Sequence, residues 1–157
     1  MPAGAHPLPS MQPRIHVITL GVSDLEQSLA FYRALGLESP GGVIGTEFRG
    51  DDDSPGGAAA MFELHGGLIL ALYGRTDLEQ DANATFDAPG SGEFSLGHLV
   101  GSRDEVDAVL AGAEAAGATL TEQPHERPLG IYSGYFRDLD GHLWEVIWNP
   151  RLTLASA

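Results

Sequence analysis

The sequence lacks cysteine, is poor in basic residues and has no long apolar run, and each absence excludes a class of function. Without cysteine, the 157-residue chain can form neither disulfides nor thiolate metal sites, and it has no cysteine nucleophile. Only 8 residues are Lys or Arg, against 22 that are Asp or Glu, so the net charge is −14. A chain this acidic repels nucleic acid and anionic membranes, and we expect neither as a partner. No apolar run approaches the length of a membrane span.

What remains is the composition of one globular domain. The chain is 43% hydrophobic and contains 21 glycines and 10 prolines, which indicates a folded protein with many turns. Residues 1–13 are proline-rich and have no apolar signal core, so they predict a flexible N-terminal tail. Residues 14–150 form the predicted domain and residues 151–157 a C-terminal tail. We expect a cytoplasmic location.

The predicted domain repeats one order of elements. Module one, residues 14–73, predicts a strand, a helix and three further strands, and module two, residues 95–150, predicts the same order. The segment 74–94 between them is polar and turn-rich and predicts a linker with one helical turn near 76–80. The predicted strands cover residues 15–22, 42–48, 58–64 and 68–73 in module one, and residues 97–101, 118–123, 131–138 and 142–148 in module two.

Both predicted helices have matching start and stop signals. Ser23 and Ser102 each begin an S-x-x-E pattern, which is the capping box of a helix N-terminus. Gly36 and Gly117 follow the last apolar residues of the two helices and are placed to end them.

Two stretches and the internal repeat resemble a known group, the vicinal oxygen chelate superfamily. The stretches are LGVSDLEQSLAFYRALGL (20–37) and FRDLDGHLWEVIWNP (136–150). The superfamily includes glyoxalase I, bleomycin-resistance proteins and extradiol dioxygenases. The resemblance implies an α+β fold in which two βαβββ modules form a curved, cupped mixed sheet around a cavity. It also implies a homodimer, and divalent-metal-assisted lyase, isomerase or dioxygenase chemistry on a small oxygenated organic molecule.

The same resemblance implies four metal-ligand positions, two in each module. In module two these positions hold His98 and Glu145, whereas in module one they hold Val17 and Ala71, which cannot bind a metal. The resemblance therefore implies an incomplete divalent-metal site. Since side chains that face each other on neighbouring strands have Cβ atoms about 5 Å apart, we expect His98 and Glu145 to converge in one hollow.

Glu145 needs a partner, because it lies in an otherwise apolar strand between Leu143 and Ile147 on one face. Three interpretations stay open. Glu145 binds a metal together with His98, it forms a hydrogen bond with His98, or it is a catalytic general base whose pKa is raised by burial.

The hairpin before Glu145 suggests a substrate pocket. A turn at 139–140 with an even number of loop residues would place Gly134 opposite Glu145 and leave open space there. Aromatic side chains two residues to either side would then form the walls. With two residues of module one added, the predicted substrate-binding residues are Thr19, Tyr73, Tyr132, Gly134 and Phe136.

The sequence leaves open two functions of different classes. One is a metal-dependent enzyme in which His98 and Glu145 hold the ion. The other is a metal-free small-molecule-binding protein of the bleomycin-resistance type, which the apolar residues Val17 and Ala71 at the implied ligand positions favour.

Overall fold

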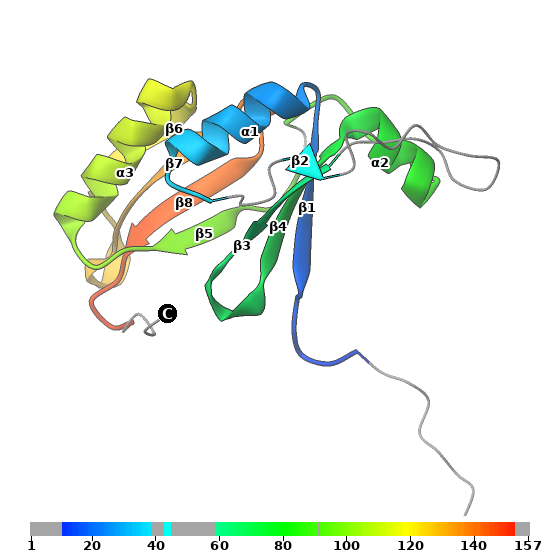
Figure 1. The fold of residues 1–157 in the computed structure, drawn as a ribbon. Coiled ribbons are helices and arrows are strands. Elements are labelled where there is room, and N and C mark those ends of the chain that lie inside the picture. The colour runs from blue at the N-terminus through cyan, green and yellow to red at the C-terminus, as the bar shows by residue number, and fades with distance from the viewer. Residues whose placement is uncertain (1–10, 39–42, 45–58, 91, 153–157) are drawn as a thin grey trace, which may run out of the picture.

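The computed structural model describes residues 11–38, 43–44, 59–90 and 92–152 (Figure 1). Module one consists of β1 (Val17–Val22), α1 (Leu25–Ala34), β2 (Val43–Ile44), β3 (Ala59–Glu63) and β4 (Ile69–Gly74). Helix α2 (Arg75–Ala82) follows it. Module two consists of β5 (Leu96–Leu99), α3 (Arg103–Ala116), β6 (Thr119–Glu126), β7 (Tyr132–Arg137) and β8 (Leu143–Trp148). The predicted βαβββ order is confirmed in both modules.

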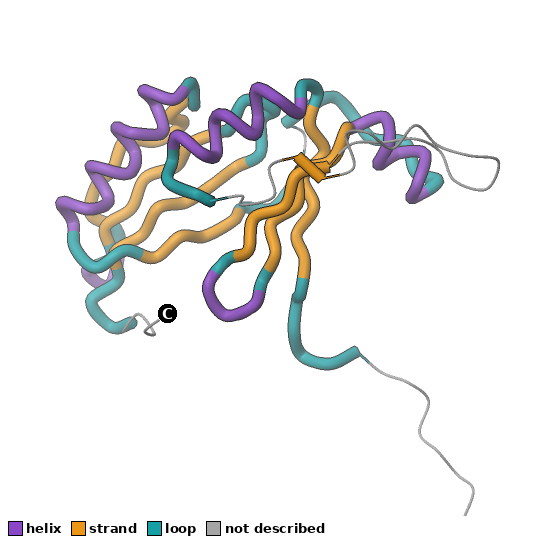
Figure 2. The backbone as a smooth tube through the Cα atoms, in the orientation of Figure 1, coloured by secondary structure: helices purple, strands orange, loops and turns teal. Residues whose placement is uncertain are grey.

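Each module forms its own four-stranded mixed sheet. The strand orders are β1-β4-β3-β2 and β5-β8-β7-β6, so the two sheets have the same topology. In each sheet the first and last strands of the module pair in parallel, while the other pairs are antiparallel. Figure 2 shows α1 and α3 lying along the same side of the module-two sheet. The α+β class is confirmed.

The helix ends follow the sequence signals with one difference. The Ser102 hydroxyl accepts a hydrogen bond from the Glu105 amide at 3.1 Å, as the capping box predicts. At α1 the cap is Asp24 instead of Ser23, and its carboxylate accepts from the Gln27 amide at 3.1 Å. Gly36 and Gly117 have left-handed φ angles of 103° and 117° just after the helices, which favour glycine.

Three segments differ from the prediction. The linker contains the eight-residue helix α2, which is longer than the single turn expected there. Strand β6 continues to Glu126, three residues beyond its predicted end. Of the predicted strand 42–48, only β2 lies within the described part of the chain.

One apolar core joins the two modules through α1. Tyr32 of α1 is buried, and its ring lies 6.1 Å from that of Phe62 in β3 and 6.0 Å from that of Trp144 in β8. The core continues into α3 through Val106 and Leu110. Burial of large apolar side chains is the main stabilising contribution to such a fold, so α1 holds the modules together.

The D-x-D-G turn between β7 and β8 strengthens the junction. The Asp140 carboxylate accepts hydrogen bonds from the Ser23 amide at 2.8 Å and the Ser28 hydroxyl at 3.0 Å. Asp138 accepts from the Tyr32 hydroxyl and pairs with His142. Burial alone would raise the pKa of Asp138, but the hydrogen bonds from His142 and Tyr32 outweigh it and hold that pKa below its usual value.

Candidate functional site

The length of the β7–β8 loop decides which residues surround Glu145. The Asp138 amide donates to the His142 carbonyl at 3.0 Å, so the loop contains three residues, 139–141. Gly141 adopts a left-handed φ of 89°, which is typical of the last position in a three-residue hairpin loop. As a result Tyr135 lies opposite Glu145, and Gly134 lies opposite Val146. The predicted loop with an even number of residues is wrong.

The predicted substrate-binding residues of β7 therefore lie on the wrong side of the sheet. Tyr132, Gly134 and Phe136 face α3, while Glu145 faces away from it. Gly134 leaves no open space, because a Cβ atom there would lie 2.6 Å from Leu110 Cδ1. The glycine instead allows α3 to pack closely on the sheet.

The register of β5 separates His98 from Glu145. The two strands are neighbours, as expected, but Gly97 lies opposite Glu145 and His98 lies opposite Val146. Because successive side chains of a strand point to opposite faces, His98 and Glu145 lie on opposite sides of the sheet. The predicted convergence is wrong, and so is a metal site or hydrogen bond that the two residues would share within one chain.

Glu145 finds its partners on the face that points away from α3, which we call the open face. The Ser133 hydroxyl donates to Glu145 Oε2 at 2.8 Å, and Arg127 Nε donates to that hydroxyl at 2.5 Å. The Arg127 guanidinium also lies over the ring of Tyr135, 5.2 Å from its centroid. Burial and a hydrogen bond to Glu145 raise the pKa of Tyr135. Ser133 and Tyr135 thus satisfy the carboxylate, and Arg127 contacts both of them.

The residues at the implied ligand positions do not fit a divalent metal. Val17 and Ala71 have no donor atoms, and of the two implied positions in module two only Glu145 lies on the open face. No group of three His, Asp or Glu side chains that could hold an ion occurs among the described residues. A stable protein site for such a metal needs three or four ligands.

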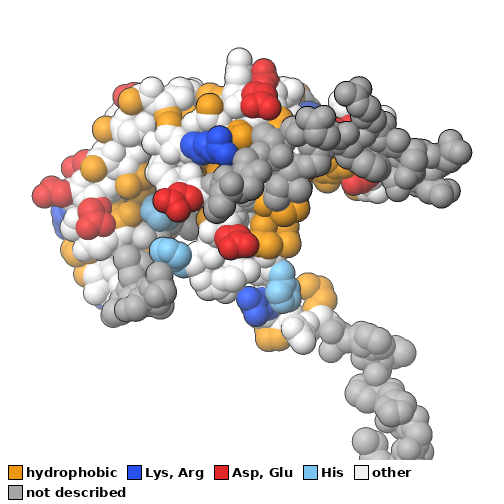
Figure 3. Space-filling model, viewed as in Figure 1, with side chains coloured by type: hydrophobic (Ala, Val, Ile, Leu, Met, Phe, Trp, Pro, Cys, Tyr) orange, Lys and Arg blue, Asp and Glu red, His pale blue; other side chains and the backbone are white. Residues whose placement is uncertain are grey.

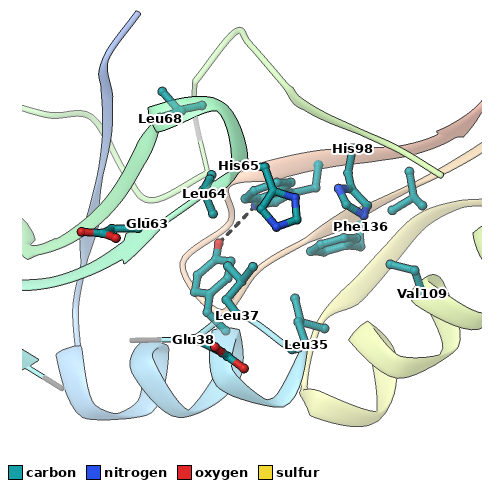
Figure 4. Close-up of a pocket in the computed structure, with 14 residues that line it drawn as sticks. Leu35, Leu37, Glu38, Glu63, Leu64, His65, Leu68, His98, Val109 and Phe136 are labelled. Carbon is teal, nitrogen blue, oxygen red and sulfur yellow. Dashed lines mark hydrogen bonds between the residues drawn. The ribbon is translucent and has the colours of Figure 1, made fainter. Parts of the chain in front are cut away.

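A pocket lies on the other side of the same sheet, between the two modules (Figure 4). Its walls come from the end of α1, the β3–β4 hairpin, β5, α3, β7 and β8. The pocket volume is about 640 Å³, which lies within the range of small-molecule sites. The structure therefore provides a concave site, but on the face that carries His98.

The floor of the pocket is aromatic. The rings of Phe136 and Trp144 are nearly parallel, with an angle of 4° and centroids 6.1 Å apart. The Trp144 indole N–H donates to the Tyr32 hydroxyl at 3.1 Å (dashed line in Figure 4). Burial, followed by the charge of Asp138, strongly raises the pKa of Tyr32, so its hydroxyl stays protonated. These polar atoms are bonded within the protein, and the floor offers mainly ring surface to a ligand.

Two imidazoles and one carboxylate supply ionisable groups at the mouth of the pocket. His65 and His98 both line the pocket, as does Phe136 (Figure 4). Desolvation by neighbouring protein atoms lowers the pKa of His98, although the residue is exposed in the single chain. Glu38 and Glu63 are exposed, and the Glu63 side chain lies on the same face of β3 as Met61, directed away from the pocket.

The predicted site residues of module one do not line this pocket. Thr19 is exposed on β1. The Tyr73 hydroxyl donates to Asp81 of α2 at 3.0 Å, so its polar atom binds a neighbouring helix. Of the residues singled out from sequence, the pocket brings together only His98 and Phe136.

Sequence reasoning missed several residues of both faces. On the open face these are Ser133, Tyr135 and Arg127, and the signal that could have found them is Gly141, since a glycine at the third loop position favours the observed hairpin. In the pocket they are His65 and Trp144, which no pattern in the sequence relates to each other.

Comparison with known proteins agrees with this architecture. A family model described as the Glyoxalase/Bleomycin resistance protein/Dioxygenase superfamily matches residues 14–146. The chain belongs to this superfamily. The resemblance inferred from the two sequence stretches is therefore confirmed. Among proteins with curated descriptions, none matches this superfamily member significantly.

Solved structures of other superfamily members share the fold. A glyoxalase-related enzyme from Fulvimarina pelagi is 28% identical with a TM-score of 0.75, and the match covers 92% of this chain and 94% of that one. A lactoylglutathione lyase from Agrobacterium tumefaciens is 26% identical with a TM-score of 0.59, over 88% of this chain and 95% of that one. A superfamily enzyme from Burkholderia phytofirmans, 20% identical with a TM-score of 0.65 over 85% and 96% of the two chains, shows the fold alone.

The helices of the described segments are all too short or too polar to cross a membrane.

Proposed function

We propose that this superfamily member is a small-molecule-binding protein that works without a bound metal. The observation that carries the proposal is the pocket of about 640 Å³ between the modules, with its floor of Phe136 and Trp144. Ligand sites are typically concave and mostly apolar, with a few polar groups that orient the ligand. His65 and His98 would supply those polar groups here.

The donor set supports a metal-free protein over a metal-dependent enzyme. The implied ligand positions retain one carboxylate, Glu145, and its Oε2 atom already accepts a hydrogen bond from Ser133. Lactoylglutathione lyase activity is the printed function of one similar structure, at 26% identity. We do not extend that activity to this chain, because Val17 and Ala71 provide no donor atoms for a catalytic ion.

Two measurements on chelator-treated protein test the proposal. Calorimetric titration with nickel, manganese, iron and zinc ions should show no uptake at micromolar affinity. Titration with a neutral aromatic probe, 1-naphthaleneethanol, should show saturable binding that EDTA does not change. Binding of one metal ion per chain, with probe binding only in the metal-loaded protein, would contradict the proposal.

A second candidate function is metal-free proton transfer by Glu145 on the open face of a homodimer. Glu145 is half-buried and hydrogen-bonded to Ser133, an environment in which carboxylates are used as general bases. The corresponding face of module one exposes Val17 (46%) and Met61 (39%), with the polar residues Thr19 and Glu63 beside them. We propose that this face of one chain covers the open face of its partner.

Light scattering during size-exclusion chromatography tests the homodimer. The wild-type protein should elute as a dimer at micromolar concentration, and Val17→Asp should shift it toward monomer because a carboxylate is costly to bury. Ala111→Asp, a change at an exposed position of α3 on the other side of the sheet, is the control and should leave the dimer intact. A wild-type monomer at this concentration would contradict the paired arrangement.

A further inference from the structure

We propose that Arg127 and Glu145, on the open face of module two, bind small zwitterions that carry a carboxylate and an ammonium group on the same carbon, as α-amino acids do. The inference goes beyond both proposed functions, because it needs neither the pocket between the modules nor proton transfer by Glu145. It depends on two opposite charges, on the hydrogen bonds that they leave open and on the space beside them.

Arg127 is held in place, yet its charge has no carboxylate partner close by. Its Nε and Nη2 atoms donate to the hydroxyl and the carbonyl of Ser133 at 2.5 and 3.3 Å, and the guanidinium lies over the ring of Tyr135. In the described part of the chain, no carboxylate oxygen lies within 4 Å of this guanidinium. A guanidinium has five N–H donors, so the two bonds to Ser133 leave three for a ligand. Paired N–H groups of this kind suit a carboxylate.

Glu145 places the opposite charge one hydroxyl group away. The Ser133 hydroxyl accepts from Arg127 and donates to Glu145 Oε2 at 2.8 Å, and Ser133 is 0% exposed. Tyr135 forms a second hydrogen bond with Glu145. A carboxylate has about four acceptor sites, so Glu145 can accept further N–H groups. A ligand that meets both protein charges must therefore carry its own two charges close together.

Gly97 leaves room for such a ligand beside Glu145. It lies opposite Glu145 on β5, and among the described residues a Cβ atom there would have only Ile147 Cδ1 within 4 Å, at 3.6 Å. Arg127, Tyr135 and Glu145 are half-buried. Charges at partly buried positions interact more strongly with a ligand than fully hydrated charges do. The remainder of the zwitterion would lie over Gly97.

The field of the whole molecule favours a zwitterion over a simple anion. The chain has a net charge of −14, and Figure 3 shows acidic side chains spread over one face. Near the site, Glu122 lies opposite Tyr135 and pairs with His125 at 3.3 Å. A field of this sign repels a ligand whose only charge is negative. A zwitterion has no net charge, so it can use Arg127 without that penalty.

Three phenyl compounds of different charge test the inference on the full chain by NMR titration and calorimetry. L-Phenylalanine carries both charges, 2-phenylethylamine only the ammonium and 3-phenylpropionate only the carboxylate. L-Phenylalanine should bind about three- to tenfold more tightly than either, because each of the others leaves one protein charge unused. The backbone amide signals of Gly97 and Tyr135 should shift during the titration.

Charge-removing variants identify the groups responsible. Arg127→Gln should weaken binding of L-phenylalanine and 3-phenylpropionate but not that of 2-phenylethylamine. Glu145→Gln should weaken binding of L-phenylalanine and 2-phenylethylamine but not that of 3-phenylpropionate. Because the two variants affect different probes, a general loss of structure cannot produce this pattern. Arg103→Gln is the matched control and should change none of the affinities, since Arg103 lies over the ring of Tyr132, which faces α3.

The outcomes separate this inference from the proposed functions. Equal affinities of the three probes, or L-phenylalanine binding that neither variant weakens, would overturn it. Absence of L-phenylalanine binding would also overturn it and leave binding of 1-naphthaleneethanol in the pocket untouched. Displacement of bound L-phenylalanine by 1-naphthaleneethanol would locate the amino acid in the pocket and overturn binding on the open face.

Discussion

The two faces of the module-two sheet differ in chemistry although they share the same strands. On the face toward α3, Val146 is 1% exposed and Phe136 is 2% exposed, and aromatic rings form the floor of the pocket. On the open face, Glu145 is half-buried and linked to Ser133 and Arg127. The alternation of side chains along β8 therefore separates an apolar binding surface from a polar cluster by a single residue step. The residues on one face therefore do not predict the function of the other face.

Phe136→Ala and Tyr135→Ala compare neighbouring aromatic residues on the two faces, and the largest effect is expected here. Removing the buried Phe136 ring leaves a cavity, so the free energy of unfolding should fall by about 3–5 kcal/mol. Tyr135 is only half-buried, and its removal should cost about 1 kcal/mol. Urea denaturation of both variants measures the difference, and equal losses would contradict the assigned faces.

Gly134→Ala and Gly97→Ala compare a glycine on each face. At Gly134 the added Cβ would lie 2.6 Å from Leu110 Cδ1 and 2.9 Å from the Glu122 carbonyl oxygen, so either the backbone or α3 must shift. We expect a loss of about 2–3 kcal/mol in the free energy of unfolding. At Gly97 the nearest atom is Ile147 Cδ1 at 3.6 Å, and the change should stay within about 0.5 kcal/mol. A larger loss at Gly97 would show that the register of β5 is different.

Tyr32→Phe tests the polar junction beside the pocket. The change removes a buried hydroxyl that bonds Asp138 and Trp144, and it should lower the free energy of unfolding by about 1–3 kcal/mol at neutral pH. Leu152, which is exposed near the C-terminus, offers a control through Leu152→Ala, with no expected change. A Tyr32→Phe protein as stable as wild type would mean that these hydrogen bonds contribute nothing.

The hydrogen bond from Tyr32 to Asp138 also predicts how the stability depends on pH. The pKa of Asp138 is lower in the folded protein than its ordinary value of 3.8, so the folded state favours the charged carboxylate. The resulting stabilisation is fully present above the unfolded pKa and is lost as the pH falls through the folded pKa. Urea midpoints measured between pH 6 and pH 2 should fall more steeply for wild type than for Tyr32→Phe. Parallel curves would contradict this coupling.

His98→Ala and Glu145→Gln give the smallest expected effects and test the separation of the faces by ligand binding. His98 borders the pocket, so its loss should raise the Kd of 1-naphthaleneethanol about two- to tenfold. Glu145 lies on the other face, and Glu145→Gln should leave that Kd unchanged within error. Similar losses in both variants would mean that the two side chains act in one site.

The fold could be predicted because its signals are local. The capping pattern at Ser102, the glycines that end both helices and the D-x-D-G turn each act within a few residues of chain. The repeated order of elements then leaves few arrangements for the strands. The same local reasoning erred at Ser23, where the adjacent Asp24 is the better-placed cap.

The arrangement of the site depends on interactions that are not local. A one-residue change in hairpin loop length reverses the face of every residue in β7 relative to Glu145, and a one-residue shift of β5 does the same for His98. Sequence spacing allowed both registers at each place. Close packing of α3 on Gly134 is consistent only with the observed register of β7 against β8.

The sequence by itself determined the order of the elements, the superfamily and the absence of metal donors at Val17 and Ala71, because residue type and short-range spacing suffice for each. Only the tertiary structure decided that Glu145 pairs with Ser133 on one face while His98 borders an aromatic pocket on the other. The physical reason is that a strand presents its residues alternately to its two sides. Which side a residue takes is settled by pairing with neighbouring strands and by the helix packed against them.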